Sequence, residues 1–188
     1  MLKIISGKFK NKTIKLHKET PCRPSTNLLR EALFNIIFSN HQKPIEECDV
    51  LDLFCGSGSF GLEALSRNAK SVEFIDINKK QLNLIEEFLH EVNQHQNKTT
   101  IICCDVKQSL PLPKIKKDII FIDPPYFQNL SEIALSKLHQ NKYLNEEALV
   151  IIELHLRENI NIPENYQLIK KREYRNSKIL VLNYTQLT

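Results

Sequence analysis

Three of the four glycines in this chain of 188 residues lie within six positions, at Gly56, Gly58 and Gly61. They follow an apolar run that ends at Phe54. Glycine adopts positive φ and lets a backbone approach a ligand closely at little steric cost. A strand, a glycine-rich turn and a helix, in that order, are typical of nucleotide-type cofactor sites. The sequence therefore predicts a cofactor loop in this segment.

Hydrophobic periodicity predicts that strands and helices alternate after an N-terminal helix. Strands are predicted at 49–54, 71–76, 99–103, 118–122 and 148–154. Helices are predicted at 25–39, 58–67, 79–93 and 130–139. Asn129 and Glu132 have the spacing of a capping box for the last helix. Repeated βα units imply an α/β fold with a mainly parallel sheet that is covered on both faces.

Each end of the chain adds a predicted β-hairpin. Residues 2–16 alternate loosely and turn near Lys10 and Asn11, and the strands 166–174 and 178–184 form an antiparallel pair. The length suits one domain. We expect that domain to span 1–188, with a basic N-terminal extension over 1–24 and an α/β catalytic body over 25–188.

Composition argues against several classes of protein and site. The chain has no run of about eighteen apolar residues, so no membrane span is expected. Its N-terminus lacks the apolar stretch of a secretory signal, and we expect a cytoplasmic protein. The five cysteines include no C-x-x-C pair, and the six histidines have no metal spacing. We therefore expect reduced thiols, no disulfide framework and no metal site.

Positive charge is concentrated in two segments, although the formal net charge is only +4. The first lies within 1–30, where Glu19 is the only acid, and the second spans 170–178. Such clusters suit a polyanion, because neutralising its phosphates releases counterions. A merely solvated face would have the same composition, so charge alone leaves both interpretations open.

Acidic residues at the predicted strand ends help to distinguish cofactors. The G-x-G-x-x-G spacing of the loop also occurs in nicotinamide and flavin enzymes. Asp52, four residues before the first loop glycine, instead favours a cationic ligand such as S-adenosylmethionine and would repel a pyrophosphate. Asp76 ends the next strand, where a carboxylate can bind ribose hydroxyls, with Glu73 as a weaker candidate. Asp105 follows the third strand and could accept a hydrogen bond from adenine, although each acid could instead cap a turn.

A second motif, Asp123-Pro124-Pro125-Tyr126, follows the apolar run 119–122. An exocyclic amine of a nucleobase is a poor nucleophile because its lone pair is delocalised into the ring. The Asp123 carboxylate and the Pro124 carbonyl could accept hydrogen bonds from that amine and localise the lone pair. Both residues precede proline and are held extended, and Tyr126 offers a face for a splayed base. The alternative is an ordinary Pro-Pro turn closed by a core tyrosine.

The two motifs together resemble those of the bacterial 16S rRNA guanine-N2 methyltransferases of the RsmD type, a branch of the class I S-adenosylmethionine-dependent enzymes. The resemblance extends over essentially the whole chain. It includes the segments 4–8, 23–35 and 61–67, which are more specific than the glycine loop. We expect the two loops to share one cleft, because sites in open α/β sheets lie outside the carboxyl ends of the strands.

The resemblance implies a Rossmann-like fold and methyl transfer from S-adenosylmethionine to N2 of one guanine in small-subunit rRNA. The expected cofactor-binding residues are Asp52, Phe54, Gly56, Gly58, Asp76 and Asp105. A flipped base would be held by Asp123, Pro124, Pro125 and Tyr126. RNA contacts are expected from Lys8, Lys10, Arg23 and Arg30. The expected partner is ribosomal RNA or an assembling small subunit, and we expect a monomeric enzyme.

Other functions stay open at this point. Adenine N6 in DNA or RNA, or a protein glutamine amide, presents a planar nitrogen that the second motif cannot distinguish from guanine N2. A nicotinamide-dependent oxidoreductase usually needs a second substrate domain, for which little chain remains. A non-catalytic module on the same fold would bind RNA without turnover.

Overall fold

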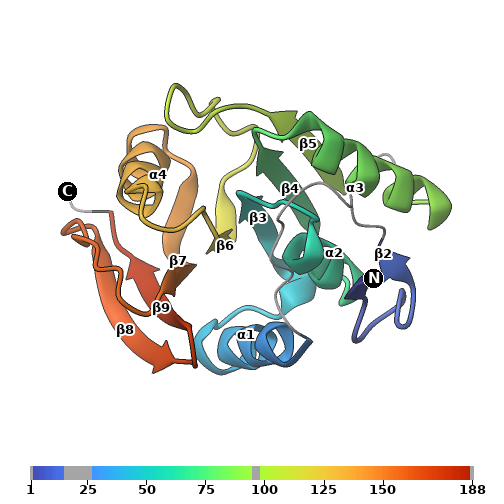
Figure 1. The fold of residues 1–188 in the computed structure, drawn as a ribbon, viewed down its shortest axis with the longest axis horizontal. Helices are drawn as coiled ribbons and strands as arrows, with labels where there is room; N and C mark the ends of the chain where they lie inside the picture. The colour runs from blue at the N-terminus through green and yellow to red at the C-terminus, as the bar shows by residue number, and fades with distance from the viewer. Residues whose placement is uncertain (1, 15–26, 95–97, 187–188) are drawn as a thin grey trace. The chain divides into compact units, whose positions relative to one another are not determined.

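A computed structural model of the chain describes residues 2–14, 27–94 and 98–186 (Figure 1). The chain divides into two compact units, residues 1–103 and 104–188. Each unit has its own strands, helices and buried apolar side chains. The expected division into an extension over 1–24 and a body over 25–188 stays a prediction.

The first unit is built on parallel strands with β4 in the middle: β3 (Asp49–Leu53), β4 (Ser71–Asp76) and β5 (Thr99–Cys103). Every residue of β3 is buried, including Asp49 and Asp52, which lie among its three apolar residues. Leu53 pairs with Ile75, so the segment that follows β3 starts beside Asp76. The strands predicted here are confirmed, with β3 ending one residue before the expected limit.

The helices of the first unit are α1 (Asn27–Asn40), the short 3-10 helix η1 (Ile45–Glu47), α2 (Ser59–Ser66) and α3 (Lys79–Glu91). Nearly all of α2 is buried, and this helix contacts β3 and β4. In α3, Asn78 precedes the first turn and its side-chain oxygen accepts hydrogen bonds from the backbone N–H groups of Lys80 and Gln81. That cap and one apolar face account for the predicted helix. Residues 25 and 26 of the first expected helix lie outside the described residues.

The N-terminal hairpin is short and packs against α2. Its strands β1 (Leu2–Lys3) and β2 (Thr13–Ile14) pair in antiparallel fashion. Gly7 has φ +80°, and a Cβ atom there would lie 1.8 Å from the Ser66 carbonyl oxygen. The Lys8 N–H donates to that same carbonyl at 2.8 Å. The hairpin is therefore confirmed, and its described part is anchored in the first unit.

The second unit has its own strand order. β6 (Lys117–Ile122) and β7 (Leu144–His155) are parallel; β9 (Ser177–Tyr184) is antiparallel to β7, and β8 (Tyr166–Glu173) is antiparallel to β9. Helix α4 (Leu130–Gln140) turns Ala134, Leu135 and Leu138 into the interior. The predicted α/β class, with mainly parallel strands and an antiparallel C-terminal hairpin, is confirmed.

Two local predictions are wrong in this unit. Asn129 does not form a capping box, because its backbone is left-handed (φ 55°, ψ 19°) and its side chain makes no cap hydrogen bond. The Glu132 carboxylate accepts instead from the Asn161 N–H at 2.6 Å. Strand β7 begins at Leu144, four residues before the expected start. The polar residues between Leu144 and Ala148 interrupt the apolar run from which the strand was predicted. Glu147 in this stretch has φ 61°, and the β6–β7 register shifts nearby.

Within the described ranges, no helix is both long and apolar enough to cross a membrane.

Candidate cofactor loop and acceptor motif

The glycine loop has the left-handed backbone that its sequence predicts. After β3 ends, φ is 61° at Phe54, 49° at Gly56 and 69° at Gly58, and α2 begins at Ser59. The Gly58 N–H closes a turn on the Cys55 carbonyl at 2.7 Å. The chain therefore passes from strand to helix through a tight turn that leads directly into the N-terminus of α2. Such a terminus favours a negatively polarised ligand group.

Two carboxylates from neighbouring strands hold this loop in shape. Asp52 in β3 accepts a hydrogen bond from the Gly61 N–H at 2.8 Å. Asp76 at the end of β4 accepts from the Gly56 N–H at 2.8 Å and from the Asn78 N–H at 2.7 Å. The structure thus brings together the predicted glycines and the first two predicted acids. Each carboxylate oxygen that accepts one of these hydrogen bonds has a second lone pair, so it can accept another hydrogen bond from a ligand.

The Asp52 carboxyl group has unusual electrostatics. Its side chain is only 2% exposed, and no lysine or arginine of the described residues forms an ion pair with it. Burial raises the pKa of Asp52 to about 8, the Gly61 N–H opposes that rise, and the charge of Asp76 adds to it. A buried acid without a cation, next to a strained loop, is a typical ligand-binding feature.

Gly61 serves packing, because a Cβ atom there would lie 2.3 Å from Cε1 of Phe74 in β4. A Cβ on Gly58 would lie 2.7 Å from the Ile85 side chain in α3. These glycines let α2 approach its neighbours closely, in addition to shaping the turn.

The second motif, Asp123-Pro124-Pro125-Tyr126, follows β6 in the second unit and is called the acceptor motif. Pro124 is buried, Pro125 is exposed, and Asp123 and Tyr126 are partly exposed. The Tyr126 hydroxyl lies 3.4 Å from a carboxylate oxygen of Glu153, and its ring centroid lies 5.4 Å from that of His155. Tyr126 is therefore fixed by β7 and keeps part of its surface open, contrary to the alternative of a core tyrosine.

Asp105 also lies in the second unit, where it shapes a turn. Its carboxylate accepts from the Lys107 N–H at 2.9 Å, and its carbonyl accepts from the N–H groups of Gln108 and Ser109. This is the turn-capping role that the sequence left open for it. Its contact with adenine stays a prediction.

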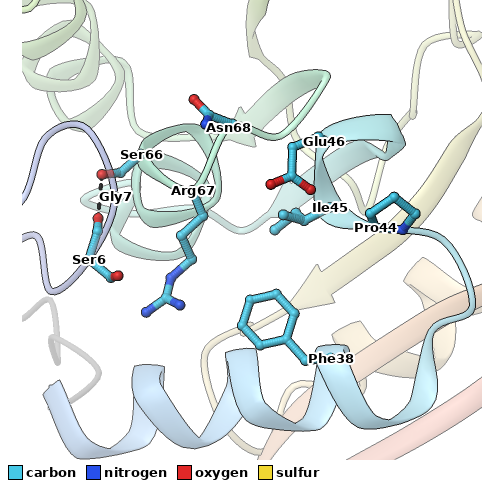
Figure 2. Close-up of a pocket in the computed structure, with 9 residues that line it drawn as sticks. All are labelled: Ser6, Gly7, Phe38, Pro44, Ile45, Glu46, Ser66, Arg67 and Asn68. Atoms are coloured by element: carbon cyan, nitrogen blue, oxygen red, sulfur yellow. Dashed lines mark hydrogen bonds between the residues drawn. The ribbon is translucent and has the colours of Figure 1, made fainter.

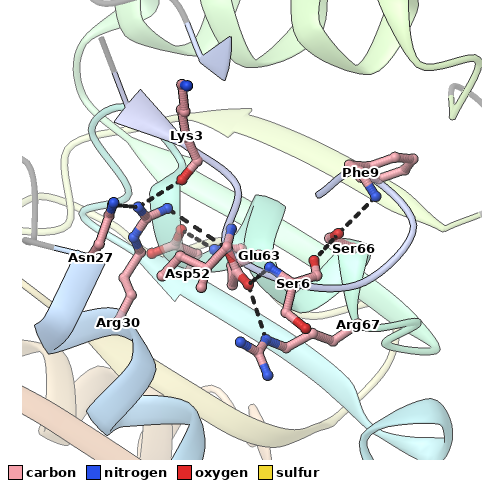
Figure 3. A network of polar contacts seen from close by, with 11 residues as sticks. Lys3, Ser6, Phe9, Asn27, Arg30, Asp52, Glu63, Ser66 and Arg67 are labelled. Atoms are coloured by element: carbon pink, nitrogen blue, oxygen red, sulfur yellow. Dashed lines mark hydrogen bonds and ion pairs between the residues drawn. The ribbon is translucent and has the colours of Figure 1, made fainter. Parts of the chain in front are cut away.

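Arg30 is not an RNA-binding residue as expected, because its side chain is fully buried. It donates to the Lys3 carbonyl at 2.9 Å and to Asn27 at 2.6 Å (Figure 3). Its guanidinium also lies 3.8 Å from the Glu63 carboxylate of α2. A charge enclosed in this way cannot reach a phosphate without breaking the fold, so Arg30 joins the N-terminal segment to α1 and α2.

Glu63, which sequence reasoning missed, is the centre of this network (Figure 3). Its carboxylate is fully buried and accepts from the N–H groups of Ile5 and Ser6 at 2.8 and 2.9 Å. It also accepts from Arg67 at 3.0 Å, one helical turn later. Only its place as the one charged residue in helix 59–66 could have indicated a structural role.

The remaining basic residues divide into exposed and buried ones. Lys8 and Lys10 are exposed on the hairpin, as an RNA contact requires, whereas Arg23 lies outside the described residues. Nearby Lys98 and partial burial lower the pKa of Lys8, with burial the larger cause. In the C-terminal cluster, Lys178 is buried and donates to Asn159 at 3.1 Å, so it does not add to a surface patch.

A pocket of about 370 Å³ lies near the carboxyl end of α2 (Figure 2). Phe38 and Arg67 line it, and the Arg67 guanidinium lies 5.8 Å from the Phe38 ring centroid. The cofactor loop precedes α2, whereas this pocket lies at the other end of the helix. At about 1.5 Å per residue, the two are separated by the length of α2. This pocket is therefore distinct from the predicted cofactor site.

Comparison with known proteins decides the family. The family described as "Conserved hypothetical protein 95" matches residues 2–183. The chain belongs to this family. A relative from Buchnera aphidicola subsp. Baizongia pistaciae, named ribosomal RNA small subunit methyltransferase D, is 38% identical, covering 95% of this chain and 88% of that protein. The Haemophilus influenzae protein of the same name is 31% identical and covers 91% and 88%. The resemblance inferred from the motifs is confirmed.

Solved structures of two similar proteins have the same fold. A proposed methyltransferase from Escherichia coli matches with a TM-score of 0.85 at 25% identity and covers 98% of each chain. A proposed methylase from Haemophilus influenzae matches with a TM-score of 0.81 at 28% identity, covering 98% of this chain and 99% of that one. The fold expected from the family is therefore present over nearly the whole length.

Proposed function

We propose that this protein transfers a methyl group from S-adenosylmethionine to the N2 amine of a guanine in small-subunit ribosomal RNA. The observation that carries the proposal is the glycine loop held by Asp52 and Asp76, in a chain whose relatives are named small-subunit rRNA methyltransferases. The substrate places the reaction in the cytoplasm, and the enzyme acts as a monomer.

The residues of the loop fit the cofactor. The buried Asp52 carboxyl, with its pKa raised to about 8, gains a counter-charge when an ammonium or sulfonium lies near it. The Asp76 carboxylate accepts hydrogen bonds from the ribose hydroxyls. The backbone at Phe54, Gly56 and Gly58, where φ is positive, lies close to the ligand. Asp105 accepts a hydrogen bond from the adenine amine. When bound, S-adenosylmethionine supplies an electrophilic methyl group on a positively charged sulfur.

The acceptor motif prepares the base. The Asp123 carboxylate and the Pro124 carbonyl accept hydrogen bonds from the two N–H groups of the amine and turn its lone pair out of the ring system. Tyr126 stacks on the base, with Glu153 and His155 fixing its ring. Asp123 also takes the proton once the amine has been methylated, because the methylated cation is far more acidic than the starting amine.

RNA phosphates are bound by the hairpin, in which Lys8 and Lys10 are exposed. Arg23 extends the same basic segment. Arg30 is omitted because it is buried.

The test is transfer of tritium from labelled S-adenosylmethionine to small ribosomal subunits from cells that lack this protein. We expect label in N2-methylguanosine at one position, and none in subunits that already carry the methyl group. Label in N6-methyladenosine, or in DNA but not rRNA, would overturn the guanine assignment.

A nicotinamide-dependent oxidoreductase is the competing function that the loop spacing allows. Thermal-shift titration separates the two, because only a ligand that binds the folded state stabilises it. At about a hundred times its Kd, S-adenosylhomocysteine should add about 2.7 kcal/mol of stability. Stabilisation by NAD and not by S-adenosylhomocysteine would favour the oxidoreductase.

A further inference from the structure

An aromatic cluster adjoins the acceptor motif in the second unit. Phe127, the residue after Tyr126, is 63% exposed, and its ring centroid lies 4.9 Å from that of His155 at the end of β7. The centroids of Tyr126 and Phe127 are 6.4 Å apart. Because β6 and β7 are parallel, with Ile122 opposite Ile152, the loop after β6 and the end of β7 lie at the same edge. The cluster is therefore built into this edge by two neighbouring strands.

The backbone of Phe127 is held in an unfavourable conformation. Its φ is +59°, a value that a bulky side chain rarely adopts. Its N–H donates to the carboxylate of Glu158 at 3.2 Å, and Glu158 is only 8% exposed. The Glu158 N–H in turn bonds the His155 carbonyl at 3.0 Å, which closes a tight turn after β7. A buried carboxylate thus fixes a strained residue whose aromatic ring is left in solvent, an arrangement typical of functional positions.

The orientation of the rings limits what they can bind. The planes of Tyr126 and Phe127 differ by 75°, and those of Phe127 and His155 by 51°. One planar base cannot stack in parallel on both Tyr126 and Phe127. A base on Phe127 is therefore a different base from the one on Tyr126.

We propose that Phe127, backed by His155, stacks on a second unpaired nucleobase of the RNA, next to the guanine held at Tyr126. This inference rests on the proposed function and deepens it: the substrate must present two unstacked neighbouring nucleotides rather than one flipped base in a continuous helix. Lys107 adds positive charge beside the loop, since its ammonium lies 3.4 Å from the Gln128 side-chain oxygen. Aromatic stacking of this kind tolerates any base and favours single strands.

The chain contains no tryptophan, which makes a direct test simple. Phe127→Trp introduces one fluorophore at the proposed contact, and Leu112→Trp introduces one at a site that is 77% exposed but precedes β6. We expect single-stranded RNA to quench the Phe127→Trp fluorescence, a duplex of the same sequence to quench it less, and neither to change that of Leu112→Trp. Equal quenching of both variants, or none, would overturn the inference.

Phe127→Gly tests the contribution to methylation without damaging the fold. Glycine suits φ +59°, so the thermal midpoint should stay level or rise, and S-adenosylhomocysteine affinity should not change. We expect kcat/KM for rRNA to fall about tenfold or more, from the loss of one stacked base. Leu112→Ala is the matched control and should behave as wild type.

These outcomes separate the inference from the function on which it rests. If wild-type protein methylates rRNA and Phe127→Gly does so equally well, the second-base contact is wrong and the proposed function stands. If wild-type protein transfers no methyl group to rRNA, the proposed function fails. Fluorescence of Phe127→Trp still decides the contact in that case, because quenching by single-stranded RNA requires no turnover.

Discussion

Replacing Glu63 by alanine should detach the N-terminal segment from helix α2. The Glu63 carboxylate accepts hydrogen bonds from Ile5, Ser6 and Arg67 at 2.8, 2.9 and 3.0 Å, and Arg30 lies 3.8 Å away. Hydrogen bonds to a charged group contribute about 1.5–3 kcal/mol each. They do not add fully, since water can reach some of the freed donors. Breaking a buried ion pair costs about 3–5 kcal/mol, because the remaining charge is left enclosed.

We therefore expect Glu63→Ala to lower the free energy of unfolding by roughly 4 kcal/mol. At this chain length, that corresponds to a fall in the thermal midpoint of roughly 8–16 °C. Urea unfolding measures the first quantity and calorimetry the second. Hydrogen exchange adds a local readout, because the Ile5 and Ser6 amides should lose protection before the strands of the first unit do.

Two further variants separate the charge from the shape of the side chain. Glu63→Gln keeps one carbonyl acceptor and should be intermediate. The double variant Glu63→Leu with Arg30→Met removes both charges, and its loss should be smaller than the sum of the two single losses. A loss below about 1 kcal/mol for Glu63→Ala, with Ile5 and Ser6 still protected, would refute the network as a source of stability.

Three other predictions concern the site. In the folded chain the pKa of Asp52 is raised from 3.8 to about 8. Stability should therefore fall as pH rises through that interval, and Asp52→Asn should abolish this fall in thermal-midpoint measurements. An equal pH dependence in the variant would contradict the raised pKa of Asp52. Asp123→Ala should abolish methyl transfer while leaving S-adenosylhomocysteine affinity by calorimetry nearly intact, and wild-type turnover would refute the acceptor role. Lys8→Ala with Lys10→Ala should weaken RNA binding and flatten its dependence on salt concentration, with Lys142→Ala as an exposed lysine control; an unchanged slope would remove the hairpin from the interface.

Most of the fold was predictable because its signals are local. The strands β4 and β5 have the predicted limits, and the apolar face of α3 was sufficient to predict that helix. The glycine loop was equally local, since Gly56 and Gly58 can be read as positions that need positive φ. These features depend on neighbours along the chain.

The errors arose where distant residues decide the outcome. Arg30 looked like a surface charge, but its partners are Lys3 and Glu63, the second of which lies 33 positions away in sequence. Glu132 had the spacing of a cap, but Asn161 from another loop takes its carboxylate. Phe127 has no sequence signal beyond following the acceptor motif, because the partner of its backbone N–H, Glu158, lies 31 positions away.

The carboxylates that shape the glycine loop belong to the folded chain itself. Asp52 accepts a hydrogen bond from the Gly61 amide and Asp76 from the Gly56 amide in the folded chain. The entropic cost of ordering this turn is therefore part of folding and not of ligand binding. Preorganisation of this kind lowers the ordering cost of binding at the proposed cofactor site. The turn therefore needs no reordering of its backbone to accept the proposed cofactor.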